Sequence, residues 1–205
     1  MLDPCGSSRP SSIGTSQVTI RRARSGDSAA LLALQHRLDE QSSYLLLERG
    51  ERPHSDHALR GRLSEQGPVG SFDLLAFLPG RDLGPVGWIA VEVSPYRRAA
   101  HVGHLVLGVD AACSSRGVGH RLLGAAVEEC RRRGLRRVEL TVMVDNLRAV
   151  ELYLRCGFLI EGLRRDSLIR DGAAVDEYAM AQLLPDTERR IRQPAPEVGT
   201  GLPHR

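Results

Sequence analysis

A glycine turn after a buried strand is the part of the chain whose residues have the clearest chemical meaning. The apolar run at 105–109 is typical of a buried strand, and Ser115–Arg116–Gly117–Val118–Gly119 then leads into an apolar helical pattern. A tight turn that opens a helix leaves several backbone N–H groups unpaired at the positive end of the helix dipole. Because glycine has no Cβ, a phosphate can approach such a backbone closely. The turn therefore predicts a phosphate-binding site.

The rest of the apolar pattern predicts the elements that would position this turn. Strands are expected at 18–23, 72–78, 86–93, 101–109, 137–144, 158–165 and 175–182. One helix is expected to begin at 25–27, with Asp27 as its cap. Further helices are expected at 54–65, 117–133 and 147–155, and Gly134 should end the helix at 117–133. This order predicts an α/β (α+β) fold, in which a mixed sheet carries helices on both faces.

Length and composition favour one folded domain without a membrane or nucleic-acid partner. The chain has 205 residues, 41% of them apolar, and no run approaches the ~18 apolar residues of a membrane helix. Residues 1–16 and the Pro-, Gly- and Arg-rich tail 185–205 are expected to be disordered, which leaves 17–184 as the domain. The formal net charge of +3 is too small to indicate nucleic-acid binding. Because the chain begins without an apolar secretory leader, we expect it in the cytoplasm.

The basic residues and the cysteines exclude several kinds of chemistry. All 28 basic residues are arginines, which is typical of a GC-rich bacterial genome and leaves no lysine for Schiff-base or P-loop chemistry. The four cysteines form no C-x-x-C pair, so no metal site is expected and they should be reduced thiols. Cys130 is expected in the core, and Cys113 beside the glycine turn. The arginines at 131–133 are expected to be solvated.

A second motif lies downstream of the turn. It reads Asp145–Asn146–x–x–Ala149–x–x–x–Tyr153–x–x–x–Gly157–Phe158–x–x–Glu161–Gly162. Together with the glycine turn, in this order and spacing, it resembles the GNAT superfamily of N-acetyltransferases over 17–184. Its layout looks most like the branch that acetylates protein N-termini or small amines. The resemblance implies a sheet that is splayed at its centre, and acetyl-CoA as the co-substrate.

The resemblance also implies where acetyl-CoA would bind. Its pyrophosphate would lie on the backbone N–H groups of five consecutive residues, Arg116, Gly117, Val118, Gly119 and His120. The backbone of Val109 would pair with the pantetheine arm, and an N–H group between Leu107 and Val109 would stabilise the oxyanion. Asn146 would contact the cofactor near the pantetheine.

The turn departs from the family pattern at Ser114, where the family usually has Gln or Arg. A serine can still cap the helix, but it loses a long side-chain contact with the phosphates. Arg116 and Arg121 are candidates to compensate for this loss.

Tyr153 and a histidine on the central strand are the main candidates for acid–base catalysis. Acetyl transfer needs a neutral amine, a stabilised carbonyl oxygen and a proton for the departing thiolate. The resemblance places the Tyr153 hydroxyl near the thioester sulfur as the general acid; a tyrosine packed in the core is the alternative. His104 is the first candidate for the general base, Glu92 on the preceding strand is its rival, and His101 is the third.

These residues indicate transfer of an acetyl group from acetyl-CoA to a primary amine by direct attack. A non-catalytic acyl-CoA-binding or regulatory module on the same fold is the alternative. Peptide N-termini, aminoglycosides, polyamines and amino-acid analogues stay open as acceptors, and Tyr44 and Tyr96 lie in segments where the resemblance puts the acceptor pocket. Trp88 is expected in the core of its strand, with a place in the acceptor pocket as the alternative. We expect a monomer or a homodimer.

Overall fold

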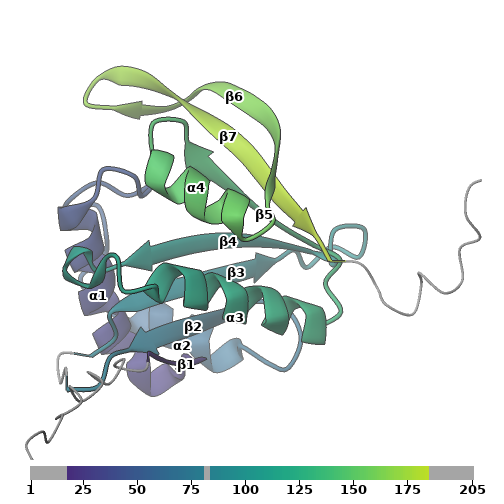
Figure 1. Cartoon of the computed structure of the whole chain (residues 1–205). Coiled ribbons are helices and arrows are strands. Elements are labelled where there is room, and N and C mark those ends of the chain that lie inside the picture. Colours follow the sequence, from purple (N-terminus) through teal and green to yellow (C-terminus); the bar gives the residue numbers. More distant parts are fainter. Residues whose placement is uncertain (1–17, 81–83, 185–205) are drawn as a thin grey trace, which may run out of the picture.

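One seven-stranded mixed sheet runs through the described part of the chain (Figure 1). The computed structural model describes residues 18–80 and 84–184. The strand order is β1-β2-β3-β4-β5-β7-β6, with β4 and β5 parallel and the other neighbours antiparallel. The strands are β1 Thr19–Arg22, β2 Phe72–Phe77, β3 Gly87–Val93, β4 Val102–Val109, β5 Arg137–Met143, β6 Leu159–Arg170 and β7 Ala173–Leu183.

The helices of these described ranges follow the predicted order. They are α1 Ser28–Gln41, α2 His57–Glu65, α3 Val118–Arg132 and α4 Leu147–Arg155, with 3-10 turns η1 Ser25–Asp27 and η2 Ala111–Cys113. The largest difference from the predicted bounds is in β6, which continues past 165 because its pairing with β7 resumes at Leu168 after an irregular stretch. The predicted disorder of 1–16 and 185–205, Cys5 and part of the predicted turn at 79–82 lie outside the described residues.

Helices cover both faces of the sheet, as predicted. On one face, α3 and α4 bury apolar side chains such as Leu122 and Val150 against the strands. On the other face, α1 and α2 pack Leu34 and Leu63 against Trp88. Figure 1 shows α3 and α4 in front of the sheet, with α1 and α2 behind it. Because each fully buried leucine contributes about 1.5–3 kcal/mol, these two clusters hold the strands in place.

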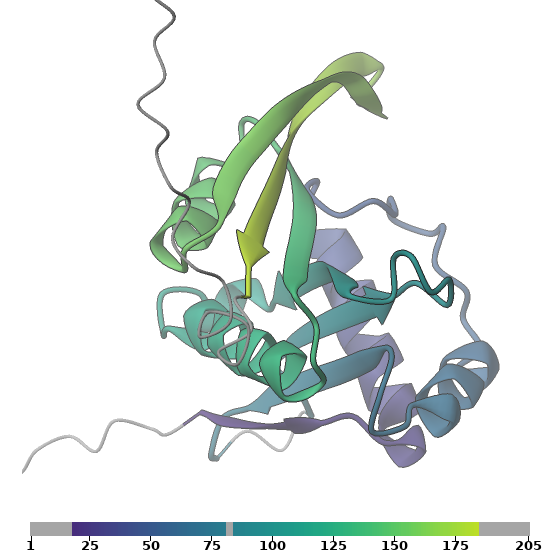
Figure 2. The ribbon, with the colours of Figure 1, turned by 90° about the vertical axis from the view of Figure 1, so that its right-hand side faces the viewer.

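β4 and β5 separate after a short parallel contact. Their pairing ends at His104 with Glu139, although the strands continue to Val109 and Met143. Figure 2 shows β5, β6 and β7 turning away from the rest of the sheet. The splayed centre that the GNAT resemblance implied is therefore confirmed, and it leaves one backbone edge of β4 without a neighbouring strand.

Asp27 is the N-cap residue of α1, as predicted, but its side chain makes no capping hydrogen bond to that helix. Its carboxylate accepts hydrogen bonds from the Arg21 guanidinium at 2.7 and 2.8 Å and from the Arg24 N–H at 2.8 Å. The carboxylate instead caps the 3-10 turn η1, which directly precedes α1.

The expectation that the arginines at 131–133 are all solvated is wrong for Arg133. Its side chain is 2% exposed, and its guanidinium lies 4.3 Å from the centroid of the Phe72 ring. It donates to Glu129 at 2.7 Å and to the Gly70 carbonyl at 2.9 Å. Burial is possible because the Glu129 carboxylate, one helical turn earlier, balances the charge.

Gly103 on β4 has no room for a side chain. An added Cβ would lie 2.7 Å from Val91 Cγ1 and 3.1 Å from Leu135 Cδ1. Because valine is stiff at χ1, we expect Gly103→Ala to lower the free energy of unfolding by about 1–3 kcal/mol. Gly124, exposed within α3 with nothing within 4 Å of an added Cβ, is the matched control. Gly124→Ala should raise the free energy of unfolding by about 1 kcal/mol. Urea unfolding measures both changes, and equal effects of the two substitutions would contradict this packing.

Candidate active site

Both ends of α4 are fixed by residues of the downstream motif. At its start, the Asn146 side chain accepts a hydrogen bond from the Ala149 N–H at 3.3 Å and so caps the helix. At its end, Gly157 has a left-handed φ of +88°, and the Phe158 N–H donates to the Tyr153 carbonyl at 3.0 Å. This is a Schellman cap, in which Phe158 packs back on Tyr153 with ring centroids 5.8 Å apart. The motif therefore holds the Tyr153 ring in a defined place.

The glycine turn presents a run of free backbone N–H groups. Ser115 and Gly117 have left-handed φ angles of +67° and +72°, and Gly117 is the N-cap of α3. In the described part of the chain, no backbone carbonyl accepts from the N–H groups of 115–120. These donors lie at the positive end of a 15-residue helix, which is a geometry suited to a phosphate. Ser114 does not cap α3 as expected, because it ends the preceding turn η2 instead.

The backbone edge of β4 that has no neighbouring strand extends from this turn to the point where β4 and β5 separate. The Asp110 N–H donates to Val86 at 2.9 Å, on the side of β3, and β3 and β4 stay in register from there. Because hydrogen-bonding direction alternates along an antiparallel strand, the backbone groups of Leu107 and Val109 point toward β5. β5 has already separated at this level. These groups are thus unpaired where the GNAT resemblance puts the pantetheine arm.

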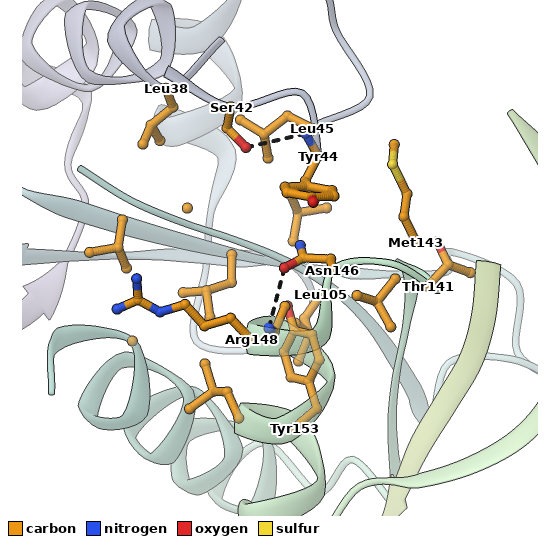
Figure 3. A pocket seen from close by; sticks show the side chains of 18 of the residues that line it. Leu38, Ser42, Tyr44, Leu45, Leu105, Thr141, Met143, Asn146, Arg148 and Tyr153 are labelled. Carbon is orange, nitrogen blue, oxygen red and sulfur yellow. Dashed lines mark hydrogen bonds between the residues drawn. The ribbon is translucent and has the colours of Figure 1, made fainter. Parts of the chain in front are cut away.

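A cavity of about 770 Å³ joins the turn, the free edge of β4 and Tyr153. It opens between β4 and β5, and the loop after α1 closes it on a further side. Figure 3 shows Tyr44 and Tyr153 on opposite sides of this space, with Met143 and Thr141 on the side of β5. Nine predicted site residues line it, namely His104, Leu107, Val109, Gly117, Val118, Gly119, His120, Asn146 and Tyr153.

Other residues singled out in the sequence lie away from this cavity. Glu92 and Arg116 are exposed and do not line it, and neither do Tyr96 and His101. Trp88 is a core residue whose indole N–H donates to Asp73 at 2.6 Å.

Two of the described cysteines lie where the sequence suggested. Cys130 is fully buried, as expected, and Cys113 is buried beside the glycine turn, where it lines the cavity.

Tyr153 is a buried acid in the wall of the cavity. Its side chain is 7% exposed, and burial, with the neighbouring Cys156, raises the pKa of Tyr153 to about 12. Burial has this effect because it disfavours the charged phenolate. The hydroxyl therefore keeps its proton at neutral pH, and it can donate that proton to a developing thiolate. The core position and the cavity position of this tyrosine are compatible, since the ring packs on Phe158 while the residue lines the cavity.

His104 lies where the splay begins, between two carboxylates. It is paired with Glu92 on β3 and with Glu139 on β5, and directly paired residues point to the same face of a sheet. His104 is exposed to the cavity, whereas Glu92 is not among the residues that line it. Glu139 accepts a hydrogen bond from Arg137 at 2.7 Å. The arrangement thus leaves the His104 side chain open to the cavity, with two carboxylate residues on the same face of the sheet.

A buried carboxylate on the far wall is not among the residues predicted from the sequence. Glu177 on β7 is 7% exposed and accepts hydrogen bonds from the Ser167 hydroxyl at 2.6 Å and from Arg164 at 3.4 Å. All three line the cavity, on the side of β5 and Met143. A signal for it exists in the sequence, since Glu177 shares the alternating parity of the buried Val175.

The loop after α1 is tied to β6 across the cavity. The Arg170 guanidinium lies 5.3 Å from the centroid of the Tyr44 ring, and Arg170 is also paired with Asp145. The hydrogen bond from Arg170 lowers the pKa of the Asp145 carboxyl. Tyr44, left without an assigned function in the sequence, is therefore part of the cavity wall.

The donor set of the cavity fits acetyl-CoA. Free N–H groups face the place of the phosphates, the unpaired edge of β4 can bond the amides of the pantetheine arm, and Tyr153 lies at the far end. Within 18–80 and 84–184, no helix is long and apolar enough to span a membrane, and no three His, Cys, Asp or Glu residues are grouped to hold a metal ion.

Known proteins are similar to this chain in sequence and in fold. A family model described as "Acetyltransferase (GNAT) family" matches residues 34–158. The L-amino acid N-acetyltransferase AaaT of Escherichia coli K12 is 33% identical over 171 residues, which are 82% of this chain and 99% of that protein.

Solved structures agree with this family. A GNAT-family acetyltransferase from Streptococcus pneumoniae has a TM-score of 0.77 at 28% identity, covering 82% of this chain and 100% of its own. A putative acetyltransferase from Salmonella typhimurium, solved with its cofactor acetyl-CoA, has a TM-score of 0.72 at 18% identity, over 82% and 95% of the two chains. Since the family model spans more than half of the sequence and the E. coli relative is matched over almost its whole length, the chain belongs to the GNAT family and is an acetyl-CoA-dependent acyltransferase.

Proposed function

We propose that the protein transfers the acetyl group of acetyl-CoA to the primary amine of a small molecule or a peptide N-terminus, with a free amino acid as the favoured acceptor. The observation that carries this proposal is the single cavity that joins the N–H groups of the glycine turn, the unpaired edge of β4, Tyr153 and His104. Amino acids are favoured because the E. coli relative is named for them and because the cavity wall holds a cation and an anion, Arg164 and Glu177, whose 3.4 Å ion pair an amino-acid zwitterion would replace.

In this mechanism, His104 takes a proton from the ammonium form of the acceptor, directly or through water. The neutral nitrogen then attacks the thioester carbon, and an N–H group at Leu107 or Val109 donates to the oxyanion. When the carbon–sulfur bond breaks, the thiolate of CoA takes the proton of the Tyr153 hydroxyl. The products are an amide and CoA, and the phenolate regains a proton from solvent. Glu92 would act on His104 as a charged neighbour, not on the substrate.

Removing the Tyr153 hydroxyl tests the general acid. Tyr153→Phe keeps the ring that packs on Phe158, so the fold and the binding of CoA should be preserved. We expect kcat to fall by about 10²–10⁴-fold, the usual contribution of a positioned acid. The measurement is the release of free CoA at saturating acceptor.

Tyr178, half-buried on β7 and outside the cavity, provides the matched control. Tyr178→Phe should leave kcat unchanged. An unchanged kcat in Tyr153→Phe would remove the acid from the mechanism. A wild-type protein that binds CoA but acetylates no amine would favour the non-catalytic acyl-CoA-binding module instead.

The general base is tested by comparing three substitutions. His104→Gln removes the titratable ring, so we expect kcat/KM to fall by about 10²-fold or more. This loss should shrink at high pH, because more of the acceptor amine is then neutral. His101→Gln, exposed and away from the cavity, should have no effect, and Glu92→Gln should have a smaller effect than His104→Gln. A larger loss in Glu92→Gln than in His104→Gln would assign the base to Glu92.

The acceptor class is tested with amino acids and their amides. If Arg164 binds the acceptor carboxylate, amino acids should have a lower KM than the matching amides. Arg164→Gln should remove this difference by raising the KM of the acid alone by about tenfold. Arg165→Gln, an exposed neighbour on β6 that does not line the cavity, controls for the loss of a positive charge. Equal KM values for acid and amide in the wild-type protein would rule out carboxylate recognition.

A further inference from the structure

Arg148 places a guanidinium without an acidic partner beside the glycine turn. It belongs to the first turn of α4, and its Nη2 donates to the Ser115 hydroxyl at 3.3 Å. In the described part of the chain this is its one hydrogen bond, and it takes part in no ion pair there. Because a guanidinium has five N–H donors, most of them stay available for a ligand.

The free donors of Arg148 face the same space as the free N–H groups of the turn. Arg148 and Ser115 both line the main cavity, and Arg148 and Ser114 also line a smaller adjoining cavity of about 400 Å³. In Figure 3, the Arg148 side chain extends along the cavity, away from Tyr153. A positive side chain and a row of backbone donors thus meet at the end of the cavity that is far from the acetyl site.

Other arginines near the turn are placed less well for this ligand. Arg116 and Arg121, the candidates to replace a long side chain at Ser114, line neither cavity, whereas Arg148, although exposed like them, lines both. Arg155 lines the main cavity, but its guanidinium is paired with Glu151 at 3.4 Å.

We infer that Arg148 binds the pyrophosphate of acetyl-CoA, together with the backbone N–H groups of the turn. This inference rests on the acetyl-CoA-dependent transfer proposed above. The pyrophosphate is held from two sides, by the N-terminus of α3 and by a guanidinium from α4. Arg148 thereby supplies the long polar contact that Ser114 cannot make, and a planar guanidinium can bond two phosphate oxygens at once.

The position of Arg148 on α4 gives this contact a second consequence. Asn146 precedes it at the helix cap, and Tyr153 follows it on the same helix. A pyrophosphate bound to both α3 and α4 holds α4 against the cofactor. Binding energy from the phosphate end of acetyl-CoA is then used to keep Tyr153 oriented at the reacting end.

Calorimetry with CoA and two of its fragments tests the inference. Arg148→Gln should weaken CoA binding by about tenfold or more, and Arg148→Lys by less, since lysine keeps the charge but not the fork. The loss in Arg148→Gln should persist with dephospho-CoA, which keeps the pyrophosphate. It should disappear with pantetheine, which has no phosphate. Unchanged thermal unfolding of the unliganded variant shows that the fold is intact, and Arg165→Gln is again the matched control.

Three results would overturn the inference. One is CoA binding to Arg148→Gln at wild-type strength. Another is a larger loss in Arg121→Gln than in Arg148→Gln, which would assign the contact to α3. The third is a loss that vanishes with dephospho-CoA, which would move Arg148 to the 3′-phosphate. These results leave acetyl transfer by the wild-type protein intact, whereas a wild-type protein that binds no CoA would contradict the proposed function itself.

Discussion

The separation of β4 from β5 after His104 and Glu139 is the constraint on which the rest of the site depends. An open sheet leaves backbone N–H and C=O groups unpaired, and each such group, if buried, costs free energy comparable to a lost hydrogen bond. α3 and α4 pack closely beside the separated strands. Gly119 allows α3, α4 and β4 to converge, because a Cβ there would lie 3.3 Å from Leu152 and 4.0 Å from Leu107. The amides of the pantetheine arm can form hydrogen bonds with the unpaired edge of β4. Cofactor binding would therefore compensate for the backbone hydrogen bonds that the open sheet lacks.

α4 shows how one set of residues can serve both the fold and the chemistry. Asn146 and Gly157 close its two ends, and Phe158 completes the second cap by packing on Tyr153. These are local requirements of a nine-residue helix, which is too short to be stable without tertiary contacts. The same caps fix the position of the tyrosine. The motif therefore consists largely of residues that cap α4, and this helix lies beside the cavity.

Features that depend on neighbours in sequence could be predicted, and features that depend on tertiary contacts could not. The element order, the ends of α4 and the donors of the turn follow from glycine, capping residues and apolar periodicity. The ion pair that buries Arg133, and the contact of Arg148 with Ser115, join residues whose approach is set only by the folded sheet. Glu177 lies between these cases, because its parity within β7 predicts burial but not the cavity it faces. The left-handed φ of Ser115 could not be predicted either, because this conformation is usually found at glycine.

The two proton-transfer groups of the proposed mechanism differ in environment in the way that their tasks require. Tyr153 is buried, and burial raises the pKa of its hydroxyl to about 12, so the group stays protonated at neutral pH, as a proton donor must. His104 is exposed and lines the cavity, on the same face of the sheet as Glu92 and Glu139. His104 belongs to the last β4–β5 pair and Tyr153 to the helix that follows β5, so the same two strands bring both groups to the cavity.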